Sequence, residues 1–120
     1  MFLTKTVIGM VAAVLTTAAV AETHTVRIVY NNFMPNYLTV QVGDEVEWLH
    51  QTTIIHRITT FNEDLPNENA HVPFGGEAFR SDFLLNGSSF THTFTSPGLY
   101  KYVCPIHPHE MFGYIEVVQN

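Results

Sequence analysis

The sequence is poor in cysteine and in basic residues. Its 120 residues include one cysteine, Cys104, and five lysines and arginines against 11 aspartates and glutamates. A single cysteine excludes the internal disulfide framework that small exported domains commonly use. The shortage of positive charge argues against a nucleic-acid-binding protein, because such proteins neutralise phosphates with Lys and Arg. An acidic chain instead favours a partner with a basic surface.

The chain also lacks an apolar run long enough to span a membrane. A run of about 14 apolar residues follows Lys5, whereas a spanning helix needs roughly 20. The run ends in small residues at Ala19 and Ala21, the pattern of a secretory signal peptide with an A-x-A cleavage site. We therefore expect residues 1–21 to be a signal peptide and residues 22–120 to be one periplasmic or secreted domain, with no membrane insertion after cleavage. An uncleaved N-terminal anchor is the alternative.

Short segments of alternating apolar and polar residues make up most of the expected mature chain. This period of two predicts half-buried β-strands, and turn residues such as V-G-D, N-G-S and S-P-G separate the segments. Seven or eight short strands at this spacing predict an all-β protein, an antiparallel β-sandwich. The expected strands are residues 24–30, 37–42, 45–50, 56–61, 88–95, 98–104 and 113–118.

One segment, residues 62–83, interrupts this rhythm. Its proline, glycine and asparagine content predicts a long loop with one helical turn. We expect the loop to end in a short strand near residues 79–85.

The lone cysteine stands in a Cys-x2-His-x3-Met motif directly after a predicted strand. An inert buried thiol is one interpretation. Zinc sites usually contain more thiolates or imidazoles and no thioether, and iron–sulfur clusters need more cysteines. Two histidines and a cysteine with a weak axial methionine form the type 1 copper arrangement. The predicted ligands of one copper ion are therefore His56, from a distant strand, and Cys104, His107 and Met111 from the motif.

The stretches VGDEVEW and SPGLYKYVCPIHPHEMFGYIEV, with a histidine between them, resemble cupredoxins of the plastocyanin, amicyanin and pseudoazurin group. The resemblance covers nearly the whole expected mature chain. It implies a Greek-key β-sandwich with one copper ion that cycles between Cu(I) and Cu(II). The matching residues are Phe33, Pro35, Gly43, Asp44, Trp48, His56, Gly98, Tyr100, Tyr102, Cys104, His107 and Met111.

The resemblance also implies how electrons reach the surface. His107 would be the solvent-side ligand, surrounded by apolar residues such as Pro35, Pro108 and Phe74. The Ile106 amide, two residues beyond the sulfur, is expected to donate a hydrogen bond to it and raise the reduction potential.

The ligand loop departs from the family pattern in its spacing. It is one residue longer than the amicyanin-like Cys-x2-His-x2-Met and one shorter than the plastocyanin-like Cys-x2-His-x4-Met. It also contains His109, and a related red-copper cupredoxin, nitrosocyanin, has a second loop histidine. The site can therefore be blue, green or red, and His109 or His71 can join it.

A second metal site is possible at the expected mature N-terminus. Cleavage after Ala21 would leave the sequence Glu22-Thr23-His24, whose amine, amides and imidazole can bind Cu(II) in a square plane. The other interpretation is that His24 belongs to the first strand and binds no metal.

The leading functional hypothesis is a monomeric electron carrier and not an enzyme. It would exchange single electrons with redox partner proteins that present a basic docking surface. A periplasmic copper chaperone or buffer, and a nitrosocyanin-like catalytic copper protein, are the alternatives. Multicopper oxidases place histidines on both sides of the cysteine, whereas Val103 and Pro105 flank Cys104 here.

Overall fold

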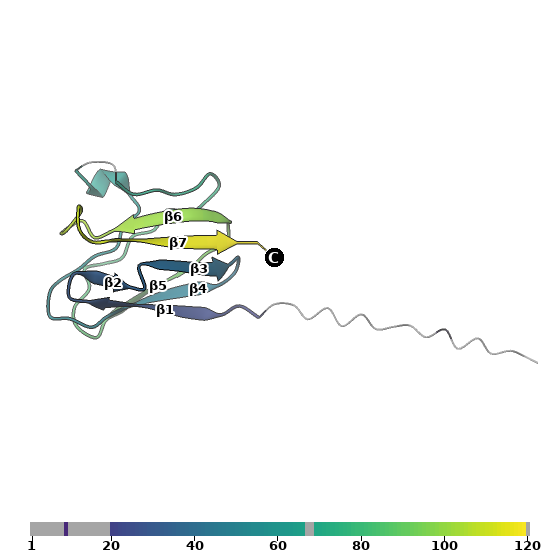
Figure 1. Cartoon of the computed structure of the whole chain (residues 1–120), viewed down its shortest axis with the longest axis horizontal. Coiled ribbons are helices and arrows are strands. Elements are labelled where there is room, and N and C mark those ends of the chain that lie inside the picture. The colour runs from purple at the N-terminus through teal and green to yellow at the C-terminus, as the bar shows by residue number, and fades with distance from the viewer. Residues whose placement is uncertain (1–8, 10–19, 67–68, 120) are drawn as a thin grey trace, which may run out of the picture.

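Two β-sheets facing each other form the body of the molecule (Figure 1). The computed structural model describes residues 20–66 and 69–119 together with Gly9, so nearly all of the predicted leader lies outside the described residues. No helix in this described part is long and apolar enough to cross a membrane. The elements are β1 (Thr23–Val29), β2 (Asn32–Met34), β3 (Tyr37–Gln41), β4 (Glu45–His50), the 3-10 helix η1 (Asn62–Asp64), β5 (Ser89–Thr93), β6 (Gly98–Val103) and β7 (Phe112–Val118).

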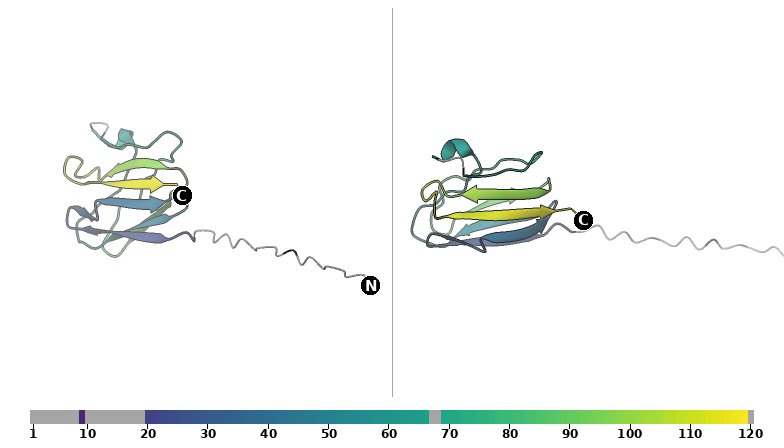
Figure 2. Two further views of the ribbon diagram at one scale, coloured as in Figure 1. Left: turned by 45° about the vertical axis from the view of Figure 1, so that its right-hand side comes forward. Right: turned by 45° about the horizontal axis from the view of Figure 1, so that its top comes forward.

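The expected sandwich is confirmed, but its strands are not all antiparallel. One sheet has the order β2-β1-β4-β5 and the other the order β3-β7-β6. The pairs β1–β4 and β3–β7 are parallel, which corrects the prediction of a purely antiparallel arrangement. The physical reason is that the chain crosses to the second sheet after β2 and returns to the first as β4, so that β4 runs in the same direction as β1 beside it (Figure 2).

Two of the expected strands, at residues 56–61 and 79–85, are present only as isolated bridges. Side-chain oxygens take backbone donors that a strand ladder would use: the Ile58 amide donates to Ser81 Oγ, and the Phe79 amide donates to Thr60 Oγ1. The short strand β2 was not expected from the sequence. The helical turn expected in the long loop is confirmed as η1.

Aromatic side chains join the two sheets. Trp48 of β4 meets Tyr102 of β6 edge-on, with ring centres 5.2 Å apart, and Tyr102 also packs edge-on against Phe33 at 4.8 Å. Tyr102 leaves no space for a side chain at position 113 of β7, because a Cβ on Gly113 would lie 2.3 Å from the Tyr102 hydroxyl oxygen. The end of β6, where the predicted ligand loop begins, is therefore fixed by tightly packed rings.

Asp44 ties the start of β1 to the turn before β4. Its buried carboxylate accepts hydrogen bonds from the main-chain nitrogens of Glu22 and Gln41, both at 3.0 Å, and its Oδ2 lies 2.9 Å from His24 Nε2. These hydrogen bonds, first those from the two backbone groups and then that from His24, lower the pKa of Asp44. The His24 ring and the Glu22 main-chain nitrogen thus both form hydrogen bonds with the Asp44 carboxylate.

We predict that Asp44→Asn destabilises the protein by about 1–2 kcal/mol near neutral pH, because a neutral amide replaces a charged acceptor. A carboxyl group with a lowered folded-state pKa stabilises the protein above its unfolded-state pKa, and this contribution is lost as the pH falls through the folded-state pKa. The difference between wild type and Asp44→Asn should therefore be constant above about pH 5 and shrink as the pH falls below about 4.

Urea unfolding across this pH range measures the effect, with Asp82→Asn as the control because Asp82 is exposed. Equal losses of stability in the two variants would contradict the role assigned to Asp44.

Candidate metal centre

The predicted ligand loop is a short closed turn between β6 and β7. It lies at the end of the sandwich opposite the C-terminus (Figure 1). The Cys104 amide donates to the Met111 carbonyl at 2.9 Å, and the His107 amide donates to the Cys104 carbonyl at 3.0 Å. The Met111 amide donates to the His107 carbonyl, also at 3.0 Å. Three potential ligands are therefore held in one hydrogen-bonded loop.

The two sulfur-bearing side chains of this loop are buried. Cys104 is a free thiol with no exposed surface, and Met111 is 1% exposed. Both belong to the main hydrophobic core, so the protein largely shields both side chains from water. His107 is only half-buried, and it lines a shallow surface pocket with Ile106, Pro108 and other loop residues.

His56 is brought to the same end of the sandwich by the segment that follows β4. It is fully buried, and its main chain pairs with Leu84 through two hydrogen bonds. Its ring centre lies 5.7 Å from that of His107. The structure thus places the distant histidine beside the loop histidine.

Both ring nitrogens of His56 have neighbours. Nδ1 lies 3.0 Å from Nε2 of His50, the last residue of β4, and Nε2 lies 3.3 Å from Oδ1 of Asn31 in the β1–β2 turn. Burial, followed by the charges of His50 and then His107, lowers the pKa of His56 to about 4. His56 is therefore neutral at neutral pH, the form in which an imidazole nitrogen binds a metal.

The sequence favoured a structural or surface histidine at position 50, and the structure buries His50 beside His56. The signal was present in the stretch EVEWLH, where Val46, Trp48 and His50 alternate and therefore share the inward face of β4.

The four predicted ligands are gathered at one end of the sandwich but do not form a closed coordination sphere. Within residues 20–66 and 69–119, no three His, Cys, Asp or Glu side chains are grouped closely enough to hold a metal ion as they stand. The ligand set of His56, Cys104, His107 and Met111 stays a prediction. The donor types nevertheless fit copper: a buried unpaired thiol, two imidazoles and a buried thioether.

Three other histidines, His71, His92 and His109, stand outside the predicted ligand set, and His109 belongs to the ligand loop itself. His71 and His109 are exposed, and His71 pairs through its main chain with Lys101 of β6. His92 stacks on Phe79 with ring centres 4.5 Å apart.

Two expectations about the surroundings of the ligands differ from the structure. The hydrogen bonds of the described residues include none from the Ile106 amide to the Cys104 sulfur. Phe74 is fully exposed and follows Pro73, which packs at Gly98 where β6 begins. Because the ligand loop follows the other end of β6, Phe74 does not surround His107.

The long loop supports the ligand loop through polar contacts. Asn69 Nδ2 donates to the Pro108 carbonyl at 2.8 Å, and Lys101 Nζ donates to Asn69 Oδ1, also at 2.8 Å. These bonds connect the ligand loop to β6 by a route outside the loop itself.

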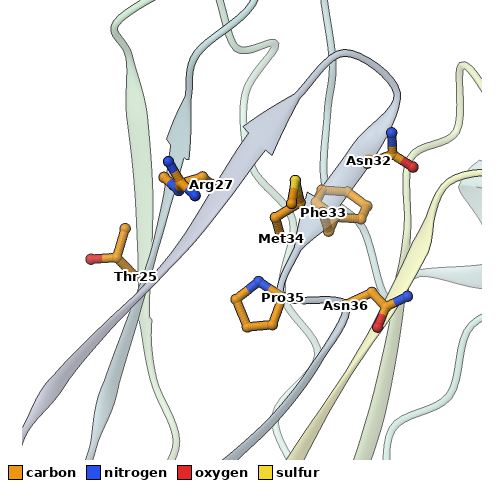
Figure 3. Close-up of a pocket in the computed structure, with 7 residues that line it drawn as sticks. All are labelled: Thr25, Arg27, Asn32, Phe33, Met34, Pro35 and Asn36. Carbon is orange, nitrogen blue, oxygen red and sulfur yellow. The ribbon is translucent and has the colours of Figure 1, made fainter.

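A groove of about 650 Å³ lies beside β2 (Figure 3). No predicted ligand lines it, so it is not the metal centre. Its lining residues are Thr25, Arg27, Asn32, Phe33, Met34, Pro35 and Asn36.

Comparison with known proteins agrees with this arrangement. The family model described as copper binding proteins of the plastocyanin/azurin family matches residues 20–118. Plastocyanin from Scenedesmus fuscus is 33% identical over 85 residues, which cover 68% of this chain and 78% of that protein. Chloroplastic plastocyanin from Tetradesmus obliquus is 34% identical over 87 residues, which cover 69% of this chain but 54% of that protein, so the chain spans about half its length.

Solved structures of copper proteins share the fold. An oxidized amicyanin variant has a TM-score of 0.63 and 25% identity, covering 79% of this chain and 81% of that one. A copper-containing nitrite reductase from Thermus scotoductus has a TM-score of 0.66 and 30% identity, covering 81% of this chain but 22% of the reductase. The described fold, the donor types and the family match agree, and the chain belongs to the plastocyanin/azurin family of copper-binding proteins.

Proposed function

We propose that this protein is an exported carrier of single electrons and not an enzyme. One copper ion would be held by His56, Cys104, His107 and Met111. One observation carries the proposal: in a chain of the copper-binding family, the single thiol is buried in one hydrogen-bonded loop with His107 and Met111, and the His56 ring lies 5.7 Å from the His107 ring.

The protein residues would fix the ligands and exclude water. Copper supplies, when bound, a one-electron change between its two oxidation states. A carrier exchanges electrons faster when little rearrangement accompanies the change, so rigidity of the ligands is what the fold must provide. Pro105 and Pro108 restrict the loop backbone, and the Cys104–Met111 hydrogen bond closes it.

Electrons would enter and leave on the side of His107. Cys104, Met111 and His56 are buried, whereas His107 is half-buried beside a shallow surface pocket. Ile106, in the same loop, is 42% exposed. A small, partly apolar surface of this kind suits the brief encounters of electron-transfer partners.

The match to a nitrite reductase does not favour an enzyme. The match covers only 22% of the reductase, so it does not indicate that this chain shares the reductase's activity. The copper chaperone remains the competing proposal, and transfer of Cu(I) to an acceptor faster than electron exchange would favour it.

We predict that the mature domain binds one copper ion and shows intense visible absorption from the thiolate, and that Cys104→Ser removes this absorption. A serine oxygen cannot supply the sulfur donor that the site needs. Metal analysis and optical and EPR spectra of the copper-loaded proteins measure the outcome.

His71→Ala is the matched control, because His71 is an exposed histidine of the long loop. Wild-type protein without copper, or a Cys104→Ser variant with the wild-type spectrum, would contradict the proposal.

The expected mature chain carries a net charge of −7, from four basic and 11 acidic residues with neutral histidines. Glu110 lies in the ligand loop and is exposed. A basic partner surface would be attracted to this side, and salt would screen that attraction.

We predict that the rate of electron exchange with a small cationic complex, hexaammineruthenium, falls as ionic strength rises, while the rate with anionic ferricyanide rises. Stopped-flow measurements test this, and Glu110→Gln should weaken the salt dependence more than Glu77→Gln, since Glu77 is exposed in the long loop. Identical salt dependence in the two variants would place the exchange site elsewhere.

A further inference from the structure

We propose that His50 is a third histidine ligand of the metal centre, beside His56. This inference rests on the proposed copper function and adds a ligand to that site. His50 Nε2 lies 3.0 Å from His56 Nδ1. Because an imidazole nitrogen binds such an ion at about 2 Å, two nitrogens at this separation can bind the same ion.

The register of the sandwich directs His50 toward the ligand loop. Trp48 of β4 packs against Tyr102 of β6. His50 is the next inward position of β4, and the buried Cys104 directly follows Val103, the last residue of β6. Both strands run toward the same end of the sandwich, since β4 is parallel to β1 and the arrows of β1 and β6 point the same way in Figure 1. His50 and Cys104 therefore both follow the Trp48–Tyr102 contact toward the metal end.

The hydrogen bonds of His56 show which nitrogen is open to a metal. Asn31 Oδ1 can only accept, so His56 Nε2 carries the hydrogen of that bond. In a neutral imidazole the other nitrogen, Nδ1, then has a lone pair. With this tautomer of His56, the 3.0 Å contact is a hydrogen bond in which His50 Nε2–H donates to that lone pair.

Metal binding by His56 alone would isolate His50. His50 has no exposed surface, and its Nδ1 has no hydrogen-bond partner. If a metal occupied the lone pair on His56 Nδ1, His50 Nε2 would lose its acceptor as well. Both of its nitrogens would then be buried and unpaired, which is unfavourable.

Ligation by His50 removes this problem. The proton moves from Nε2 to Nδ1 of His50, no other group changes protonation, and the lone pair freed on Nε2 binds the ion. One buried nitrogen then remains unpaired instead of two. A third imidazole also makes the donor set harder, which favours Cu(II) over Cu(I) and lowers the reduction potential.

The test counts histidine ligands in the copper-loaded mature protein. Protein labelled with ¹⁵N-histidine is prepared as wild type, His50→Gln and His92→Gln, and electron–nuclear double resonance with copper K-edge absorption gives the number of bound imidazoles. His92→Gln is the matched control, because His92 is a partly buried histidine that stacks on Phe79. We expect three imidazoles in wild type and in His92→Gln, and two in His50→Gln.

The His50→Gln variant should also have a higher reduction potential and about tenfold or more weaker Cu(II) binding. If His50→Gln fails to fold, the count in wild type still decides. Two imidazoles in wild type, or an unchanged count in a folded His50→Gln variant, would overturn this inference while leaving the electron-carrier function intact. A wild-type protein that binds no copper would overturn the proposed function and this inference with it.

Discussion

The contact between Trp48 and Tyr102 is the constraint on which the rest of the structure depends. It joins the two sheets at a ring-centre distance of 5.2 Å. It sits two residues before His50, the last residue of β4, and two residues before Cys104, which directly follows β6. Because side chains alternate along a strand, fixing these two rings also fixes the direction of the next inward side chains. A slip of one residue in either strand would turn His50 or Cys104 away from the core. The packing of two apolar rings thus determines where the polar and sulfur donors meet.

The end of the sandwich that holds the ligand loop between β6 and β7, here called the metal end, is built from segments far apart in the chain. The β1–β2 turn contributes Asn31, the end of β4 contributes His50, and the segment after it contributes His56. The ligand loop closes against them and is supported by the long loop through Asn69. A bound metal would therefore connect both sheets, which gives a domain of this size a further source of stability beyond its core.

Local polar contacts explain why two segments that were expected to be strands are irregular in the structure. Ser81 and Thr60 replace strand partners with their hydroxyl oxygens, so two segments with strand-like sequences stay irregular. Such side-chain to backbone bonds compete with ladder formation, and which one wins depends on the neighbouring segment in space. The segment from Gln51 to His56 is also irregular, and it brings His56 to the end of the sandwich that holds the ligand loop.

The sequence by itself determined the sandwich, most strand positions and the donor types. Period-two alternation and turn residues are local properties, and Cys104, His107 and Met111 are close in the chain, so one loop had to hold them. The tertiary structure alone decided that β1 and β4 are parallel, that Phe74 lies away from the ligand loop, and that His50 is buried against His56. These features depend on how the chain crosses between sheets and on contacts between residues of different segments, and neither is encoded in a local pattern of apolar and polar residues.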